Sequence, residues 1–357
     1  MTNNTENRIS RVRERFAGLG VDGLLITKQE NQAYVTGFSS DDLFVILTEK
    51  EQYIMTDSRY TETVADHCPD FRLVESKKDY GLSDFLAELA LPVLGYEQEA
   101  MTVGEYRRLA DKLGEKRLSG TSGLVESVRV IKDEREIETI GRAAALGDRC
   151  FSHMLSWFRE GVTEREAALE IEMFFKSNGA SRLSFDTICI FGPHTSLPHG
   201  VPGETPLKKG DLITMDFGCV VDDYCSDMTR TIAFGSATEE QKEVYQIVLE
   251  AQLAGVNGLK AGMTCREGDR LCRDVIEAAG YGAYFGHGTG HGVGLEIHEA
   301  PTLGPRSDET LQENMTVTIE PGIYLPKKFG VRIEDLAIVT SFGIMNKVCS
   351  AKELIIL

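Results

Sequence analysis

Residues 285–299 of the chain read FGHGTGHGVGLEIHE. Three of the seven histidines in the chain, His287, His291 and His298, fall within twelve residues here. Glycines alternate with them, and a glycine in a strand lets other groups approach the backbone closely. One isolated histidine is more often a core or surface residue. Three histidines in one glycine-rich segment indicate a functional site.

The glycines themselves do not form a dinucleotide-binding loop. The pattern GxGxxG, begun at Gly286, needs a third glycine where His291 stands. Begun at Gly288, the same pattern needs a glycine where Val293 stands. Neither register fits, so the segment indicates a histidine site and not a phosphate site.

Two aspartates upstream lie in strand-like sequence. Asp216 falls in DLITMDFG (211–218), and Asp227 follows eleven residues later in YCSDMTRT (224–231). Strands disfavour aspartate, and a buried carboxylate is costly without a partner. With a turn at residues 221–223, Asp216 and Asp227 are expected to lie opposite each other on one face of a hairpin. Two like charges there indicate a metal ion between them, the alternative being solvated strand ends.

Two glutamates downstream also follow strand-like runs. Glu320 stands in TVTIEPGIY (316–324), and Glu334 stands in GVRIED (330–335). Strand propensity does not favour a glutamate at either position. Arg332 is two residues from Glu334, so both side chains are expected on the same strand face. Arg332 can therefore orient a carboxylate ligand.

Together these segments supply four carboxylates and one imidazole. Four negative charges balance two divalent cations, and oxygen-rich ligation with a single nitrogen suits Mn²⁺, Co²⁺, Zn²⁺ or Fe²⁺. Such a centre lowers the pKa of water from about 16 towards neutrality and so generates a nucleophile for hydrolysis. The candidate ligands are Asp216, Asp227, His291, Glu320 and Glu334.

In this order, the segments MDFG, SDMTRT, HGTGHGVGLEIHE, IEPGIY and RIED resemble the pita-bread metallopeptidases. More narrowly, they resemble the Xaa-Pro aminopeptidase and Xaa-Pro dipeptidase (prolidase) branch. YVTGF at 34–38 and TDSRY at 56–60 resemble a creatinase-like N-terminal domain. The resemblance covers nearly the whole chain. It implies a protease that cuts between an N-terminal residue and a following proline.

The resemblance also implies roles for the ligands. Asp216 would bind one metal through both carboxylate oxygens, and Asp227 and Glu334 would bridge two metals. His291 and Glu320 would bind the second metal, and Glu320 would also move the proton of the attacking water. Two divalent ions are expected, Mn²⁺ in the first place, with Co²⁺, Zn²⁺ or Fe²⁺ as alternatives.

Further residues take substrate roles by the same resemblance. His199, in LPHGVPG (197–203), matches the histidine that holds the substrate and its oxyanion. His194, nearby, is expected to be structural. The other roles are contact with the scissile-bond region for His298, a wall of the proline pocket for His287, and support of the site for Tyr324 and Arg332.

The length of 357 residues predicts two domains. Helical and strand-like segments alternate up to about residue 125, so residues 1–125 are expected to form an α/β, creatinase-like N-terminal domain. Residues 126–357 are expected to form an α+β pita-bread catalytic domain with helices on a largely antiparallel sheet. Capping boxes predict helix starts at Thr163, Thr238 and Thr264.

Charge and composition exclude several classes of partner. With 38 basic and 56 acidic residues, the net charge of −18 argues against nucleic-acid binding. The sequence shows no secretory leader and no run of 18 apolar residues, so a cytoplasmic protein without membrane association is expected. Eight scattered cysteines favour reduced thiols. By the resemblance, a homodimer is expected.

Three functions remain open. A dedicated enzyme for Xaa-Pro bonds has a physical reason, because proline lacks an N–H and fixes φ near −65°. The segment GFSSDDLF (37–44) most resembles small bacterial aminopeptidase-type members, which favours Xaa-Pro aminopeptidase. Xaa-Pro dipeptidase is the alternative, and a non-catalytic, metal-containing peptide-binding module is the third. Metal-free members of the fold, creatinase among them, lack the five ligands present here.

Overall fold

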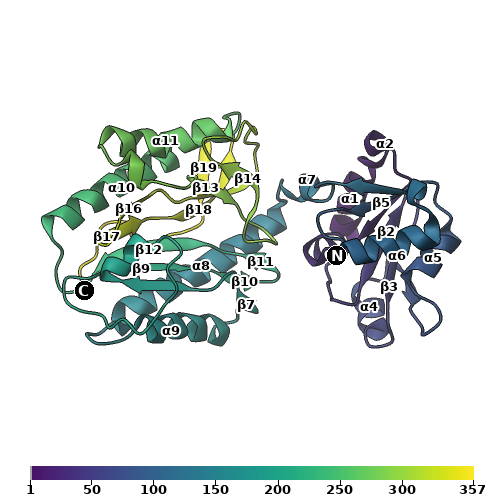
Figure 1. Cartoon of the computed structure of the whole chain (residues 1–357), viewed down its shortest axis with the longest axis horizontal. Helices are drawn as coiled ribbons and strands as arrows, with labels where there is room; N and C mark the ends of the chain where they lie inside the picture. Colours follow the sequence, from purple (N-terminus) through teal and green to yellow (C-terminus); the bar gives the residue numbers. More distant parts are fainter. Residues whose placement is uncertain (1) are drawn as a thin grey trace. The chain divides into compact units, whose positions relative to one another are not determined.

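The structure, a computed structural model, describes residues 2–357. The chain divides into two compact units, one ending at residue 129 and the other spanning 130–357 (Figure 1). The division falls four residues beyond the expected boundary because the short helix α7 (Glu126–Arg129) is tied to the first unit. The side chain of Asn31 donates to Glu126 at 2.8 Å and accepts from Arg129 at 2.9 Å.

The N-terminal unit is built on one six-stranded mixed sheet. Its strand order is β4-β3-β2-β1-β5-β6, in which β1–β2 and β2–β3 are antiparallel and the other pairs parallel. The strands are β1 (Gly23–Ile26), β2 (Phe44–Thr48), β3 (Gln52–Thr56), β4 (Arg72–Glu75), β5 (Leu94–Glu97) and β6 (Leu118–Thr121). The helices are α1 (Thr2–Arg13), α2 (Phe16–Leu19), α3 (Gln29–Thr36), α4 (Thr61–His67), α5 (Leu82–Leu89) and α6 (Val103–Leu113), besides α7.

Both faces of this sheet are covered. Leu25 of β1 packs with Phe85 of α5 and Leu109 of α6 in one apolar cluster. Leu24 and Ile26 point to the opposite face, because side chains alternate along a strand, and both are also buried. A strand buried on both faces reads as a continuous apolar run, which explains the sequence GLLI and the predicted α/β class.

Four long helices frame the second unit, and the capping signals predict three of them. These helices are α8 (Glu134–Trp157), α9 (Glu164–Ser177), α10 (Glu239–Gly258) and α11 (Cys265–Ala278). Thr163, Thr238 and Thr264 each accept a hydrogen bond from the backbone three residues on, which confirms the predicted capping boxes. Asp133 caps α8 in the same way.

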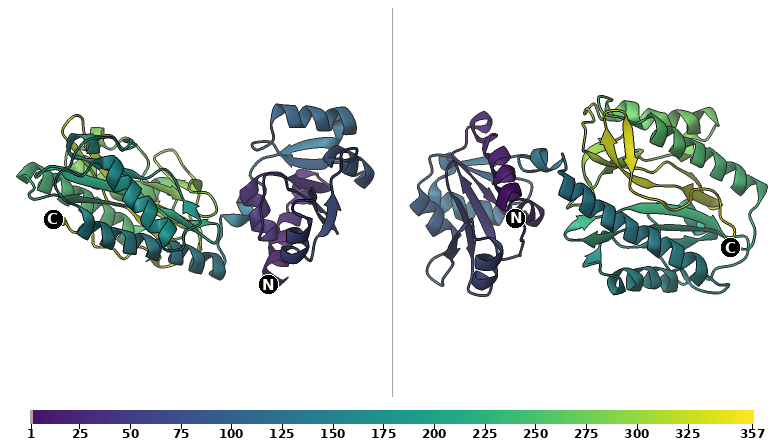
Figure 2. Two further views of the ribbon diagram at one scale, coloured as in Figure 1. Left: turned by 90° about the horizontal axis from the view of Figure 1, so that it is seen from below. Right: turned by 180° about the vertical axis from the view of Figure 1, so that it is seen from behind.

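The strands of this unit form several short antiparallel ladders between the helices. They are β7 (Arg182–Leu183), β8 (Ile188–Phe191), β9 (Leu212–Phe217), β10 (Cys219–Val221), β11 (Tyr224–Cys225), β12 (Met228–Ala233), β13 (Gly290–Gly292), β14 (Glu299–Leu303), β15 (Thr316–Ile319), β16 (Gly322–Leu325), β17 (Phe329–Arg332), β18 (Asp335–Thr340) and β19 (Gly343–Asn346). Helices α8 and α9 pack against β7, β8, β10 and β11, whereas α10 and α11 pack against β14–β17 and β19 (Figure 2).

Apolar packing fixes α10 onto the strands that end at the candidate ligands. Val244 and Val248 of α10 share one buried cluster with Ile319, the residue before Glu320. Burying such a side chain fully contributes roughly 1.5–3 kcal/mol. No helix within residues 2–357 combines the length and the apolar character that a membrane crossing needs.

Candidate metal centre

A two-residue turn sets the register of the two aspartates. Asp222 and Asp223 have φ values of 45° and 70°, as a tight hairpin turn requires. That turn places Thr229 of β12, and not Asp227, opposite Asp216 of β9. The expectation that the two aspartates face each other directly is therefore wrong. Asp227 stands two residues before Thr229, on the same face, and both carboxylates line one cavity.

The remaining ligand candidates come from three other segments and meet the aspartates. His291 lies on β13, Glu320 directly follows β15, and Glu334 stands between β17 and β18. His291 Nε2 is 3.5 Å from Asp227 Oδ2 and 3.4 Å from Glu320 Oε1. Ligand atoms of Asp227, His291 and Glu334 all lie within 4.8 Å of one another. The structure thus gathers all five residues at one place.

Burial and mutual repulsion act on these carboxylates. Burial, followed by the repulsion of Asp216, raises the pKa of Glu320 to about 7, although Arg332 opposes the shift. Burial and the neighbouring carboxylates also hold the pKa of Asp227 and of Glu334 well above the ordinary range. Opposite charge within about 4–6 Å would reverse such shifts. The cluster therefore has the electrostatics of a cation site.

Two atoms show that the residues fit a metal. Asp216 Oδ2 accepts a hydrogen bond from Arg332 at 2.5 Å, but within residues 2–357 nothing donates to its buried Oδ1. Leaving a buried acceptor without a partner costs about 1–3 kcal/mol, so binding of a cation by Oδ1 would be favourable. His291 Nδ1 donates to the carbonyl of Gly292 at 3.0 Å, which leaves the lone pair on Nε2. Burial lowers the pKa of His291 to about 4, which favours the neutral, metal-binding form.

A chain of hydrogen bonds supports the site from the side. The guanidinium of Arg332 donates to Tyr324 Oη at 2.9 Å and to Thr229 Oγ1 at 3.0 Å. His287 Nδ1 donates to the carbonyl of Gly288 at 2.8 Å, so its Nε2 accepts from Tyr324 at 2.9 Å. Burial lowers the pKa of His287 to about 4 and raises that of Tyr324 to about 12. These groups therefore keep their charge states over the ordinary pH range.

The five candidate ligands lie at the wall of a cavity of about 520 Å³. The rings of His291 and His298 are 4.3 Å apart between centroids, and His199 lines the cavity as well. Tyr324 is not among the residues that line the cavity, but it forms hydrogen bonds with His287 and Arg332, which do line it. The predicted site residues at the cavity wall are His199, Asp216, Asp227, His287, His291, His298, Glu320, Arg332 and Glu334.

Several residues that line the cavity were not among the site residues predicted from the sequence. Phe185, Ile188 and Val201 give the cavity apolar walls, and Asp186 and Thr302 add polar groups. Four of them lie outside every segment that the sequence singled out, and Val201 lies in LPHGVPG without a chemical signal of its own. Apolar residues beside a strand look the same in a sequence whether they face a core or a cavity, so no pattern could identify them as part of the site.

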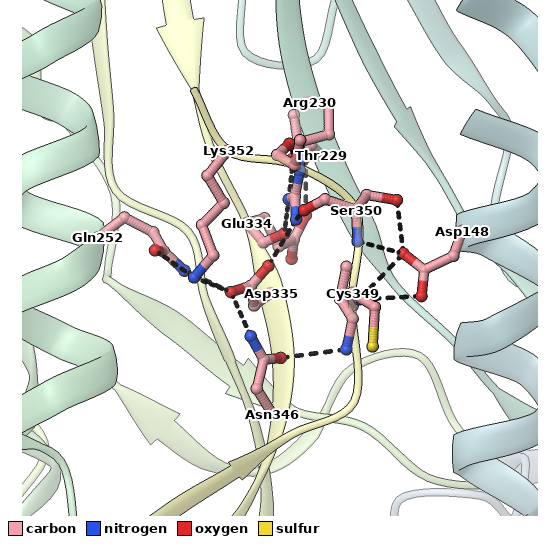
Figure 3. Close-up of polar contacts among 12 residues, drawn as sticks. Asp148, Thr229, Arg230, Gln252, Glu334, Asp335, Asn346, Cys349, Ser350 and Lys352 are labelled. Carbon is pink, nitrogen blue, oxygen red and sulfur yellow. Dashed lines mark hydrogen bonds and ion pairs between the residues drawn. The ribbon is translucent and has the colours of Figure 1, made fainter. Parts of the chain in front are cut away.

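Behind Glu334, a polar network fixes its backbone (Figure 3). Arg230 donates to the carbonyl of Glu334 at 2.5 Å and pairs with Asp335 at 2.8 Å. Burial alone would raise the pKa of Asp335, but Arg230 and Lys352 hold it below its ordinary value. Gln252 and Asn346 also donate to this carboxylate. The sequence carried one signal for the network, the two adjacent acids of RIED.

Glycines allow the histidine segment to lie against its neighbours. A Cβ on Gly290 would lie 2.0 Å from the carbonyl oxygen of Thr318, and one on Gly292 would lie 2.2 Å from that of Ala300. Real Cβ atoms do not approach so closely. This confirms the expectation that the glycines permit close backbone approach, and it places His291 within reach of Glu320.

Comparisons with known proteins agree with this geometry. Residues 8–131 match the family Creatinase/Prolidase N-terminal domain, and residues 138–341 match Metallopeptidase family M24. An uncharacterized peptidase of Bacillus subtilis, YqhT, is 41% identical, and the alignment covers 98% of this chain and 100% of that protein.

Two solved structures extend the comparison. A structure of the Xaa-Pro dipeptidase from Bacillus anthracis has a TM-score of 0.96 and 45% identity, covering 99% of this chain and 100% of that one. The X-Pro aminopeptidase from Thermotoga maritima has a TM-score of 0.90 and 34% identity, covering 97% and 99%.

The fold and the site define a metal-dependent hydrolase that acts on peptides. The chain belongs to metallopeptidase family M24, with a creatinase-type N-terminal domain in front of the catalytic domain. Two predictions are confirmed by these matches, the pita-bread architecture and the peptidase class. The family also agrees with the cluster of candidate metal ligands at residues 227, 291 and 334.

Proposed function

We propose that this metallopeptidase hydrolyses the peptide bond between an N-terminal residue and a following proline. The observation that carries the proposal is the cluster of five ligand side chains at the wall of a cavity that also contains His199, His287 and His298. A volume of about 520 Å³ lies in the range of pockets that bind small ligands and short peptides. The names of the relatives support the preference for proline.

The five ligands would hold two divalent ions, with Mn²⁺ as our first choice. Asp216 would hold one ion, His291 and Glu320 the other, and Asp227 and Glu334 would be shared. When bound, the ions would polarise the scissile carbonyl and lower the pKa of water to near neutrality. The buried, unpartnered Oδ1 of Asp216 and the free lone pair on His291 Nε2 support this assignment.

Glu320 is the residue that we propose to move the proton. Its carboxylate lies at the cavity wall and accepts a hydrogen bond from Thr318 at 3.1 Å, which holds it in place. It can take the proton of the attacking water and deliver it to the proline nitrogen, which must be protonated to leave. His199 and His298 line the same cavity and can donate to the oxygen that gains charge.

Two members of the Xaa-Pro class remain as candidates. The sequence segment 37–44 favours an aminopeptidase, which acts on longer peptides, and one solved neighbour carries that name. A dipeptidase, which acts only on Xaa-Pro dipeptides, is favoured by the neighbour with 45% identity. We also propose a cytoplasmic homodimer, by resemblance to the family, and sedimentation of the purified chain tests the dimer.

A substrate pair separates the two activities. The Mn²⁺-loaded protein is incubated with Ala-Pro and with Ala-Pro-Ala, and released alanine is measured, with a chelated sample and Ala-Ala as controls. Cleavage of the tripeptide that chelation abolishes supports the aminopeptidase, and cleavage of the dipeptide alone supports the dipeptidase. Cleavage of neither peptide by protein that contains Mn²⁺ would overturn the proposal.

Replacing the proton carrier tests the mechanism. Glu320→Gln keeps the shape of the side chain but not its ability to accept a proton. It is expected to lower kcat by at least about 100-fold, in the range of general acid–base catalysis. Unchanged turnover in a variant that still binds Mn²⁺ would remove Glu320 from this role.

A further inference from the structure

Glu164, the first residue of α9, is a buried carboxylate that the proposed chemistry does not use. Its side chain is 0% exposed, although an acid in the first turn of a helix usually faces solvent. The adjacent capping box uses Glu166 instead, so capping does not explain Glu164. A buried charge is retained where hydrogen bonds satisfy it, so its partners indicate its purpose.

The partners of Glu164 are the two ends of one segment. Oε1 accepts from the backbone N–H of Phe191 at 2.9 Å, and Oε2 accepts from that of Gly203 at 2.9 Å. Phe191 ends β8, and Gly203 stands twelve residues later along the chain. One carboxylate thus clamps both ends of residues 191–203. Within that segment, residues 198–202 line the cavity, and His199 is among them.

His194 connects the clamp to the middle of the segment. Its Nδ1 lies 2.9 and 3.0 Å from the two oxygens of Glu164 and donates to them. A Cβ on Gly200 would lie 3.1 Å from His194 Nε2, so the opposite edge of the ring packs against the residue that follows His199. The imidazole therefore fills the space between the carboxylate and the backbone at the cavity.

The far side of the segment is anchored to the site itself. Arg332 donates to the carbonyl of Pro198 at 3.3 Å. Thr195 accepts from the backbone N–H of Gly330 at 2.8 Å. The backbone on either side of His199 is therefore held, by Arg332 at residue 198 and by His194 at residue 200. Such a double anchor fixes the direction in which an imidazole reaches a substrate.

We propose that Glu164 and His194 are positioning residues, which hold His199 in the orientation that contacts the peptide. The proposal rests on the proposed function, because that function gives His199 its substrate. It assigns a role to His194, which the sequence indicated to be structural, and to Glu164, which no motif singled out.

A matched pair of substitutions on one helix tests the clamp. Glu164→Gln replaces one acceptor oxygen by an NH₂ group that faces N–H donors. Glu170→Gln is the control, because Glu170 also lies on α9 and pairs with a histidine, His153, at 2.6 Å, but lies outside the cavity wall. We expect Glu164→Gln to lower kcat/KM for the Xaa-Pro peptide at least about tenfold with bound Mn²⁺ unchanged, and Glu170→Gln to stay within about twofold.

A double-mutant cycle distinguishes positioning from general support of the fold. If Glu164 acts through His199, then Glu164→Gln costs about tenfold in the wild-type chain but little in the His199→Ala background, because coupled residues are not additive. An equal loss of kcat/KM in both backgrounds would overturn the proposal. His194→Asn, which keeps a donor towards Glu164, is expected to recover more kcat/KM than His194→Ala. Equal losses in these two variants would also overturn it, and this comparison remains if Glu164→Gln does not fold.

Hydrogen exchange provides a readout that does not need turnover. Glu164→Gln and His194→Ala are expected to speed amide exchange in residues 191–203 at least about tenfold while β9 and β15 stay unchanged. Unchanged exchange in that segment would reject the clamp. If the wild-type chain cleaves no Xaa-Pro peptide, the proposed function fails, and the exchange experiment still decides whether Glu164 and His194 hold the segment.

Discussion

Arg230 and Asp335 form an ion pair that is buried on both sides, with 2.8 Å between Nη2 and Oδ1 and side chains 1% and 0% exposed. The pair lies behind the carboxylate of Glu334, and Arg230 also donates to the carbonyl of that residue. The backbone of one metal-ligand candidate is thus fixed by charges that never reach the cavity.

Breaking this pair is expected to be costly. Arg230→Met leaves Asp335 with less compensation in an apolar surrounding, so the free energy of unfolding should fall by about 3–5 kcal/mol. Arg142→Met is the control, since its pair with Asp222 is 51% and 70% exposed and is worth at most about 1 kcal/mol. Urea denaturation of both variants measures the difference. Equal losses of unfolding free energy in the two variants would show that the buried Arg230–Asp335 pair stabilises the protein no more than the exposed pair does.

Thr229 is expected to tune metal affinity without being a ligand. Its hydroxyl donates to Glu334 Oε2 at 2.7 Å and accepts from Arg332. Thr229→Val removes both bonds at nearly constant volume, so Mn²⁺ affinity should fall about 10–100-fold, as for other residues that orient ligands. Thr214→Val is the matched control on the same hairpin, because the hydroxyl of Thr214 contacts that of Thr231. Titration calorimetry with Mn²⁺ should separate the two variants, and similar affinities would contradict the assignment.

Removal of the metal is expected to make stability fall as the pH rises. The folded pKa of Glu320 is raised to about 7, and those of Asp227 and Glu334 are held well above their ordinary values, so each group contributes stability below its unfolded pKa and loses it as the pH rises through its folded pKa. His287 and His291 have lowered pKa values of about 4 when folded, so they oppose this trend only at lower pH, where the unfolded histidines are protonated and the folded ones are not.

Thermal melts at pH 6.5 and 8.5, with and without chelator, measure the effect. We expect the chelated protein to lose several degrees of Tm between the two pH values, and the Mn²⁺-loaded protein to lose little, because bound cations remove the repulsion. A chelated protein that is equally stable at both pH values would show that ionisation of these carboxylates does not destabilise the metal-free protein.

Two glycines in one segment should respond very differently to alanine. A Cβ at position 290 meets the backbone of Thr318, whereas a Cβ at position 286 meets no atom within 4 Å among residues 2–357, its two chain neighbours aside. Gly290→Ala is therefore expected to destabilise the protein by at least about 1–3 kcal/mol and to weaken Mn²⁺ binding, while Gly286→Ala leaves both nearly unchanged. Urea denaturation and metal titration of the pair check this. A tolerated Gly290→Ala would mean that β13 and β15 can separate.

The sequence predicted the elements and the ligand candidates better than their geometry. Capping boxes located α9, α10 and α11 because the signal is local, and the candidate ligands could be recognised because carboxylates are unusual in strands. The predicted cross-strand partner of Asp216 was Asp227, but the observed partner is Thr229, two positions further on. The prediction failed because the register depends on which two residues form the turn. The contacts of Glu164 join residues up to 39 positions apart, and no local pattern records them.

The cavity wall contains a charged set of side chains and an apolar set. The charged set is interlocked through Arg332, Thr229 and the strands, whereas Phe185, Ile188 and Val201 are apolar and form no hydrogen bonds through their side chains. Phe185 and Ile188 lie outside residues 191–203, so an engineer could vary these two residues to change which peptides the cavity accepts while the charged set stays in place. At these two positions, selectivity can be redesigned separately from catalysis.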